Sequence, residues 1–151
     1  MFVAEYEATP SNIESFHPHD ILDGRKKTIS TIVQRQGQPD FRRKLLEAYN
    51  GRCAISEYDV IEALEAAHII PYRGSQTNHP SNGLLLRADL HTLFDLGLIA
   101  IDTKNMAVII SPSLIGTAYH KFVGKVLHLP LNERVSPSRE ALDEHRAWTG
   151  L

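Results

Sequence analysis

The chain has 151 residues, of which 42% are hydrophobic and 23% are charged, and its formal net charge is −2. This length fits one domain, and this composition excludes both an intrinsically disordered chain and one that spans a membrane. The single cysteine excludes an internal disulfide and any multi-cysteine zinc site. The acidic N-terminus lacks the basic and apolar pattern of a signal peptide, so we expect a cytoplasmic protein.

The pattern of residues in the first part of the chain predicts an arm, a strand and a helix. Residues 1–24 carry proline and glycine without a sustained period, which predicts an N-terminal arm ahead of one domain over residues 25–151. Residues 28–34 are rich in β-branched side chains, which predicts a strand. Residues 40–49 repeat apolar side chains every three to four positions, which predicts a helix.

Short elements follow along the rest of the chain, in the order strands at 52–55 and 60–70, a helix at 87–96, and a hairpin with strands 98–101 and 106–110. A last helix is predicted to begin at an N-cap on Ser136, with Pro137 in its first turn and Gly150 beyond its end. Leu142, His145 and Trp148 share one face of that helix. Short strands and helices joined by much loop indicate the α+β class.

Basic residues are concentrated between Arg25 and Arg52, where eight lysines and arginines stand against two acidic residues. Such an uneven distribution predicts a phosphate-binding face on a nearly neutral molecule, and a solvated helix face is the alternative. The nucleic-acid contacts that we predict are Arg42, Arg43, Lys44, Arg73 and Arg87.

The segment from residue 65 to residue 102 carries a histidine, an asparagine and a histidine in a specific context. His68 lies in the run AAHIIPY, and Asn82 and His91 lie in the run NHPSNGLLLRADLHTLFDLGLIAID. Fourteen positions separate His68 from Asn82, and nine separate Asn82 from His91. In this order and context the segment resembles the HNH endonuclease family, and within it the McrA-like restriction branch.

The resemblance covers residues 36–112 closely and continues more loosely to the end of the chain. It implies an α+β fold with a ββα-metal (His-Me finger) HNH nuclease core over residues 52–102, together with additional short strands and flanking helices. The activity that it implies is metal-dependent hydrolysis of phosphodiester bonds of DNA, in restriction or defence.

The resemblance also assigns roles to single residues. His68, on the second strand of the ββα unit, is the expected general base, because a neutral imidazole accepts a proton near neutral pH. Asn82 is expected to hold the connecting loop and to orient the base. His91 is the expected first metal ligand, and Asp95, on the same helix face four residues later, the second. Taken singly, each has a structural alternative, and Asp95 could instead cap the helix end or pair with Arg87.

The expected metal site departs from the family pattern at Ala67, where many relatives place a ligand directly before the base. The expected cofactor is a divalent cation, Mg²⁺ or Mn²⁺, with Co²⁺, Ni²⁺ and Zn²⁺ as alternatives, whose shell water and phosphate would complete. A carboxylate at this position, Ala67→Asp, is expected to tighten metal binding. The chain also lacks the four-cysteine zinc that braces many relatives, so hydrophobic packing must replace it.

DNA is the expected partner, contacted mainly through its phosphates, and sequence preference would require a separate recognition domain or subunit. The alternatives are an inactive DNA-binding module that has kept the HNH fold, and an effector domain that a partner restrains.

His79 is interpreted as a solvated loop residue, with phosphate binding or help to the leaving group as the alternative. The other histidines are interpreted as structural or exposed: His17, His19, His120, His128 and His145. Cys53 is interpreted as a buried small apolar residue.

Overall fold

The structure is a computed structural model that describes residue 18 and residues 21–151. His17 and His19 lie outside the described residues. A helix begins at Ile21, so the last four residues of the predicted arm are helical. Across the described ranges, no helix is long and apolar enough to cross a membrane.

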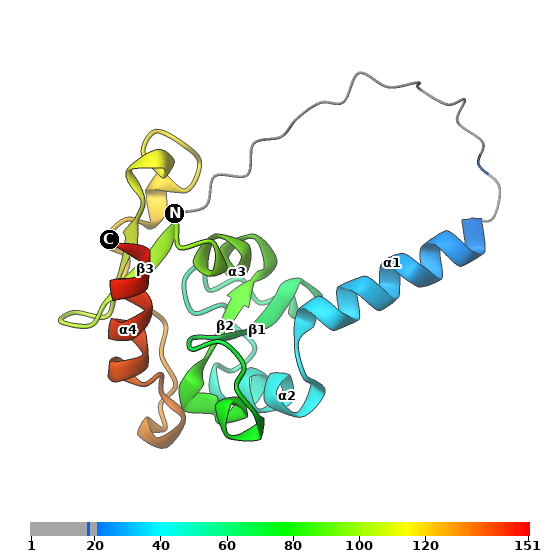
Figure 1. Ribbon diagram of the computed structural model, residues 1–151, viewed down its shortest axis with the longest axis horizontal. Helices are drawn as coiled ribbons and strands as arrows, with labels where there is room; N and C mark the ends of the chain where they lie inside the picture. The colour runs from blue at the N-terminus through cyan, green and yellow to red at the C-terminus, as the bar shows by residue number, and fades with distance from the viewer. Residues whose placement is uncertain (1–17, 19–20) are drawn as a thin grey trace.

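Two antiparallel strands and one helix form the centre of the molecule (Figure 1). β1 (Leu64–His68) pairs with β2 (Gly83–Arg87), so that His68 stands opposite Gly83. α3 (Ala88–Asp95) follows β2 directly. Four of the five residues in each strand are buried, so neither strand alternates between apolar and polar residues, and Glu65 is the one buried charged residue in them. The fold is therefore α+β with the predicted ββα unit, but His68 ends the first strand of the unit and not the second.

α2 (Pro39–Ala48) packs against β1 and β2, which confirms the helix predicted at 40–49 to within one residue. Phe41 and Leu45 lie one turn apart on its buried face. A methyl group on Gly83 would come within 2.7 Å of Phe41 Cζ and 2.8 Å of Leu45 Cδ1. The absence of a side chain at Gly83 therefore lets the helix approach the strand pair closely, directly beside His68.

The prediction of a strand at residues 28–34 was wrong, because α1 (Ile21–Gln36) covers this segment and projects from the body of the molecule (Figure 1). β-branched side chains favour strands when they pack on a half-buried sheet. Here Ile29 and Val33 are 61% and 55% exposed, so no packing on a sheet stabilises a strand at these residues. The surrounding Lys, Arg and Gln residues favour a helix instead.

Residues 52–55 do not form the predicted strand: residues 52–53 are irregular and residues 54–55 lie in a turn. Ala54 N–H donates to the carbonyl of Leu85 at 2.8 Å, whereas Cys53 N–H donates to Tyr58 within its own turn at 2.9 Å. Cys53 Sγ also accepts from Arg87 N–H at 3.3 Å, so the segment touches β2 at two residues without forming a ladder. Cys53 is fully buried, which confirms its interpretation as a small apolar core residue.

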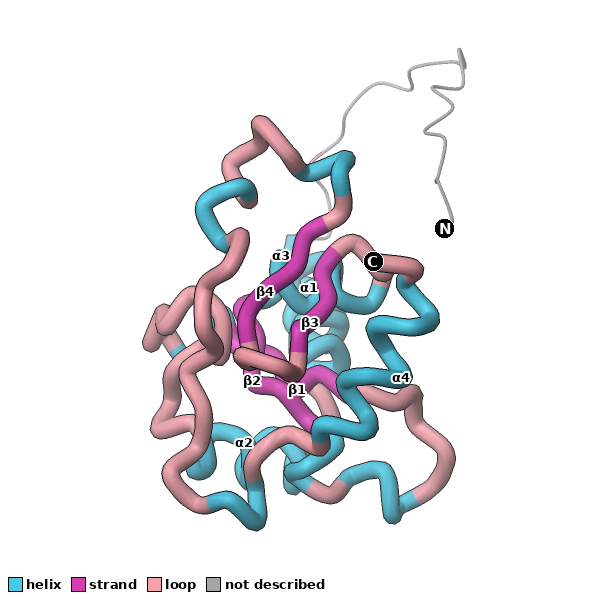
Figure 2. The backbone as a smooth tube through the Cα atoms, turned by 90° about the vertical axis from the view of Figure 1, so that its left-hand side faces the viewer, coloured by secondary structure: helices cyan, strands magenta, loops and turns pink. Residues whose placement is uncertain are grey.

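The predicted hairpin is confirmed by β3 (Ile99–Asp102) and β4 (Ala107–Ile110), which follow α3 (Figure 2). α4 (Arg139–Thr149) packs on β3. Its N-cap is Ser138, whose side chain accepts a backbone N–H of the first turn, so the predicted cap at Ser136 was wrong by two residues. A residue before proline avoids helical backbone angles, and Ser136 is extended for this reason.

Candidate active site

A cavity of about 880 Å³ opens where β1, α3, α4 and the loop after β1 meet. Its wall contains His68 from β1 together with His91 and Asp95 from α3. The end of α1 contributes Arg35, and α4 contributes Trp148. The fold therefore brings three of the four central motif residues to one cavity, although they span 28 positions of the sequence.

His68 is half-buried and has three neighbours that fix its ring. Nε2 lies 2.8 Å from Oδ1 of Asn78. Because an amide oxygen can only accept, Nε2 carries the proton of the neutral ring and Nδ1 keeps its lone pair. The ring stacks on Phe41 with centroids 4.4 Å apart, and it meets the edge of Tyr72 at 6.0 Å. This arrangement leaves Nδ1 as the nitrogen that can accept a proton.

The side chain of Asn82 ties together the loop between β1 and β2. Its Oδ1 accepts from Ile70 N–H at 2.9 Å, and its Nδ2 donates to the carbonyls of Ile70 and Thr77 at 3.0 Å each. These bonds hold the loop, but none of them reaches His68. The orienting role expected for Asn82 is geometrically that of Asn78, a loop residue that the motif does not single out.

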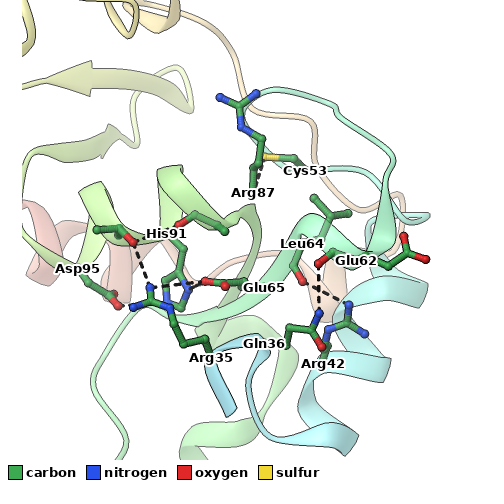
Figure 3. Close-up of polar contacts among 12 residues, drawn as sticks. Arg35, Gln36, Arg42, Cys53, Glu62, Leu64, Glu65, Arg87, His91 and Asp95 are labelled. Carbon is green, nitrogen blue, oxygen red and sulfur yellow. Dashed lines mark hydrogen bonds and ion pairs between the residues drawn. The ribbon is translucent and has the colours of Figure 1, made fainter. Parts of the chain in front are cut away.

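His91 lies between two carboxylates (Figure 3). Its Nδ1 is 2.7 Å from Oε1 of Glu65 on β1, and its Nε2 is 3.1 Å from Oδ2 of Asp95. Arg35 Nη2 lies 3.7 Å from the same Glu65 oxygen and donates to the Thr92 hydroxyl at 3.0 Å. Asp95 thus faces His91, and the alternative pairing with Arg87 does not occur.

The two carboxylates determine the electrostatics of His91. Burial lowers the pKa of the imidazole, but hydrogen bonding and charge from Asp95, followed by those from Glu65, outweigh burial, so its pKa is raised. A carboxylate that accepts from one ring nitrogen fixes the ring and strengthens the other nitrogen as a ligand. Glu65 accepts from Nδ1 of His91 in this way, and Nε2 is left beside Asp95.

Nε2 of His91 and the half-exposed carboxylate of Asp95 fit a divalent cation as one nitrogen and one oxygen donor. Among residues 18 and 21–151, no group of three His, Cys, Asp or Glu residues is arranged to hold a metal ion. Water and substrate oxygens would therefore have to complete the shell. Ala67 is fully buried opposite Leu84, so an Asp at this position would bury a carboxylate, and it is no longer expected to tighten metal binding.

The basic residues of α2, which were predicted to form a phosphate-binding face, have protein partners. Arg42 donates to the carbonyls of Ile61 and Leu64 at 2.8 and 3.3 Å. Arg43 lies 2.8 Å from Asp40, and Lys44 lies 3.4 Å from the same carboxylate. Arg43 and Lys44 are thus paired with carboxylates of their own helix, whereas Arg42 is held by backbone carbonyls, and contact of these three residues with nucleic acid stays a prediction.

The two remaining predicted contacts differ in their surroundings. Arg87 makes a two-bond pair with Asp89 at 2.6 and 2.9 Å, and its guanidinium lies over the ring of Tyr58. Arg73 is exposed and lies in the cavity wall, next to Tyr72. Of the five predicted cations, Arg73 is the one that lines the cavity of His68.

Several residues of the site are ones to which the sequence motif assigned no role. Glu65 and Arg35 approach His91 from β1 and α1, and His145 on α4 lines the cavity beside them. Burial lowers the pKa of His145, against the hydrogen bond to the Phe94 carbonyl, so this ring is neutral. The one local signal for Glu65 is a carboxylate within an otherwise apolar strand.

Comparison with known proteins finds one family model that matches the region of the motif. Residues 53–102 match a family model described as HNH endonuclease. No curated protein matches the chain. A solved structure titled "Modification dependent TagI restriction endonuclease" is 23% identical with a TM-score of 0.48, and the match covers 70% of this chain and 36% of that one. The chain thus corresponds to about a third of that protein's length.

Proposed function

We propose, from the match of residues 53–102 to the HNH endonuclease model, that this chain is an HNH endonuclease that hydrolyses phosphodiester bonds of DNA with the aid of a divalent metal. The observation that carries the proposal is the hydrogen bond from His68 Nε2 to Asn78, in the cavity that also holds His91 and Asp95. It gives the cavity a base of defined tautomer beside two metal-ligand side chains.

His68 is the proposed general base. Hydrolysis requires a proton to be removed from the attacking water, and Nδ1 is the ring nitrogen available for it. The proton received there makes the ring a cation whose Nε2–H still donates to Asn78, so the amide keeps the ring in place during the transfer. Asn82 supports this geometry indirectly, because its three hydrogen bonds hold the loop that carries Asn78.

His91 and Asp95 are the proposed metal ligands, and Glu65 is a positioning residue for His91. A bound divalent cation would neutralise charge that develops on the phosphate during cleavage. Mg²⁺ or Mn²⁺ suits a shell filled mainly by oxygen, with Co²⁺, Ni²⁺ or Zn²⁺ as alternatives. Arg73, exposed in the cavity wall, is the proposed phosphate contact.

The broader role is also proposed from the family premise. We infer a cytoplasmic restriction or defence nuclease of the McrA-like branch, organised as an arm over residues 1–24 and a domain over residues 25–151. Its specificity would come from a separate recognition domain or subunit, because the contacts proposed within residues 25–151 are to phosphates.

The second candidate is an HNH-fold module that binds DNA without cutting it. The observation in its favour is that the described part of the chain offers two metal ligands, with Ala67 buried where many relatives carry another. In this case the cavity would hold nucleic acid without the charge neutralisation that cleavage needs.

The test is a cleavage survey with the full chain. Supercoiled plasmid, single-stranded DNA and RNA are incubated with Mg²⁺ or Mn²⁺, and again with EDTA. Metal-dependent nicking that His91→Ala abolishes is the expected result. If the protein binds the plasmid but does not cleave it with any metal, the module that binds DNA without cutting it is favoured.

A further inference from the structure

Trp148 is the outermost ring of a three-ring column that joins α3 to α4. Phe94 and His145 stack with centroids 3.7 Å apart and 7° between their planes, and the His145 ring lies 5.8 Å from that of Trp148. His145 Nε2 donates to the carbonyl of Phe94 at 3.0 Å, so a hydrogen bond also fixes the middle ring. The Trp148 ring is tilted by 46° to that of His145, and through these contacts it is linked to the helix that carries His91.

Gly97 supports the same ring from the turn after α3. Its φ of +74° suits glycine, and a Cβ there would lie 3.1 Å from Cζ3 of Trp148. The indole therefore rests against backbone on one side and against His145 on another. This packing fixes the position of the ring.

Despite this support, Trp148 is 66% exposed, and it lines the cavity that contains His91 and Asp95. Tyr72 is 62% exposed and lines the same cavity from the loop after β1. Two large exposed aromatic rings in one concave site indicate a ligand with flat apolar faces.

The flat ligand that a nuclease site meets is a nucleobase. Aromatic side chains stack on bases of any sequence, because every base has a π-face. Bases inside a duplex already stack on one another, and extruding one costs a few kcal/mol. Bases of a single strand require no such extrusion.

We propose that Trp148 and Tyr72 are stacking platforms for nucleobases beside the cleavage site, and that the cavity prefers single-stranded nucleic acid to an intact duplex. The proposal rests on the proposed nuclease function, which it extends to substrate class. Stacking would hold the bases next to the reacting phosphate, while His68 and Arg73 face the backbone.

Trp148 provides the first test itself, because it is the single tryptophan of the chain. Its emission is followed in EDTA during titration with a single strand of about 12 nucleotides, and then with a duplex of the same length and sequence. Saturable quenching by the single strand, at concentrations where the duplex has little effect, is expected. Equal quenching by both probes, or none by either, would overturn the proposal. So would emission that changes with protein concentration alone, because the indole would then contact a second copy of the chain.

Variants give the second test, read by anisotropy of the labelled single strand. Trp148→Ala should weaken binding about 5- to 150-fold, the range that follows from the loss of one stacked base, while Trp148→Phe should recover most of it. Tyr58→Ala removes an exposed aromatic ring outside the cavity and serves as the matched control. Equal losses for Trp148→Ala and Tyr58→Ala would overturn the proposal.

Cleavage of the same two probes with Mg²⁺ measures the nuclease function separately. If the wild type cleaves a probe but its tryptophan emission is not quenched, the proposed stacking of bases is refuted and the nuclease function stands. Quenching without cleavage of any substrate would refute the nuclease function and retain the platform.

Discussion

Replacing Asn82 with alanine should destabilise the protein through the loop between β1 and β2. The substitution removes three hydrogen bonds, two of them to Ile70, and leaves the N–H of Ile70 without its acceptor. At about 0.5–1.5 kcal/mol net for each bond, we expect a loss of about 3 kcal/mol in the free energy of unfolding. This is a large part of the roughly 5–15 kcal/mol that holds a typical domain together.

Urea denaturation followed by far-UV circular dichroism measures this loss. Asn132→Ala is the matched control, because Asn132 is exposed and its side chain accepts one hydrogen bond, from Arg134 N–H. We expect the control to lose less than about 1 kcal/mol. Asn82→Asp should lower stability at least as much as Asn82→Ala. It keeps the acceptor for Ile70 N–H but places a carboxylate oxygen next to the carbonyl oxygens of Ile70 and Thr77, which repel it. Equal stability of Asn82→Ala and Asn132→Ala would refute the reasoning.

Three further predictions concern packing, metal and charge. Gly83→Ala should lower stability by about 1–3 kcal/mol, because its methyl would meet Phe41 and Leu45; Gly24→Ala, with open space around it, should show no such loss by urea denaturation. In calorimetric titration with Mn²⁺, His91→Ala should abolish binding and Asp95→Ala should weaken it, and wild-type binding by Asp95→Ala would remove that residue from the ligand set. Arg73→Gln should reduce the slope of log binding constant against log salt by about 0.9, while Arg43→Gln should leave it unchanged, because Arg43 is already paired with Asp40 and Glu47; equal slopes for the two variants would contradict this placement.

Elements whose sequence pattern matches their burial were predictable. α2 shows an apolar period of three to four and buries that face, and the β3–β4 hairpin has two apolar runs around a polar turn. α1 was not predictable in this way, since its β-branched residues lie on an exposed helix that packs no sheet. The cap of α4 was missed because both Ser136 and Ser138 flank Pro137, and either could accept the first-turn N–H.

For the candidate site, too, some residues could be predicted from the sequence and others could not. His68, His91 and Asp95 were predicted from their order, spacing and sequence context, and the fold brings them to one cavity, while their roles stay predictions. Glu65 lies 26 positions from His91 and Phe94 lies 51 from His145, and these contacts exist only after the chain has folded. The same holds for the cations: composition reveals an excess of basic residues on α2, but not that Asp40 and Glu47 neutralise two of them.

Single-turnover cleavage of a defined DNA strand by the wild type, His68→Ala and His79→Ala tests the central claim most directly. His79 is an exposed histidine of the same loop, bonded to Ser81, and it does not line the cavity of His68. With His68 as the general base, His68→Ala should cleave about 10²- to 10⁴-fold more slowly, while His79→Ala stays within a few-fold of the wild type. A His68→Ala rate within a few-fold of the wild type, at unchanged folding, would contradict the assignment.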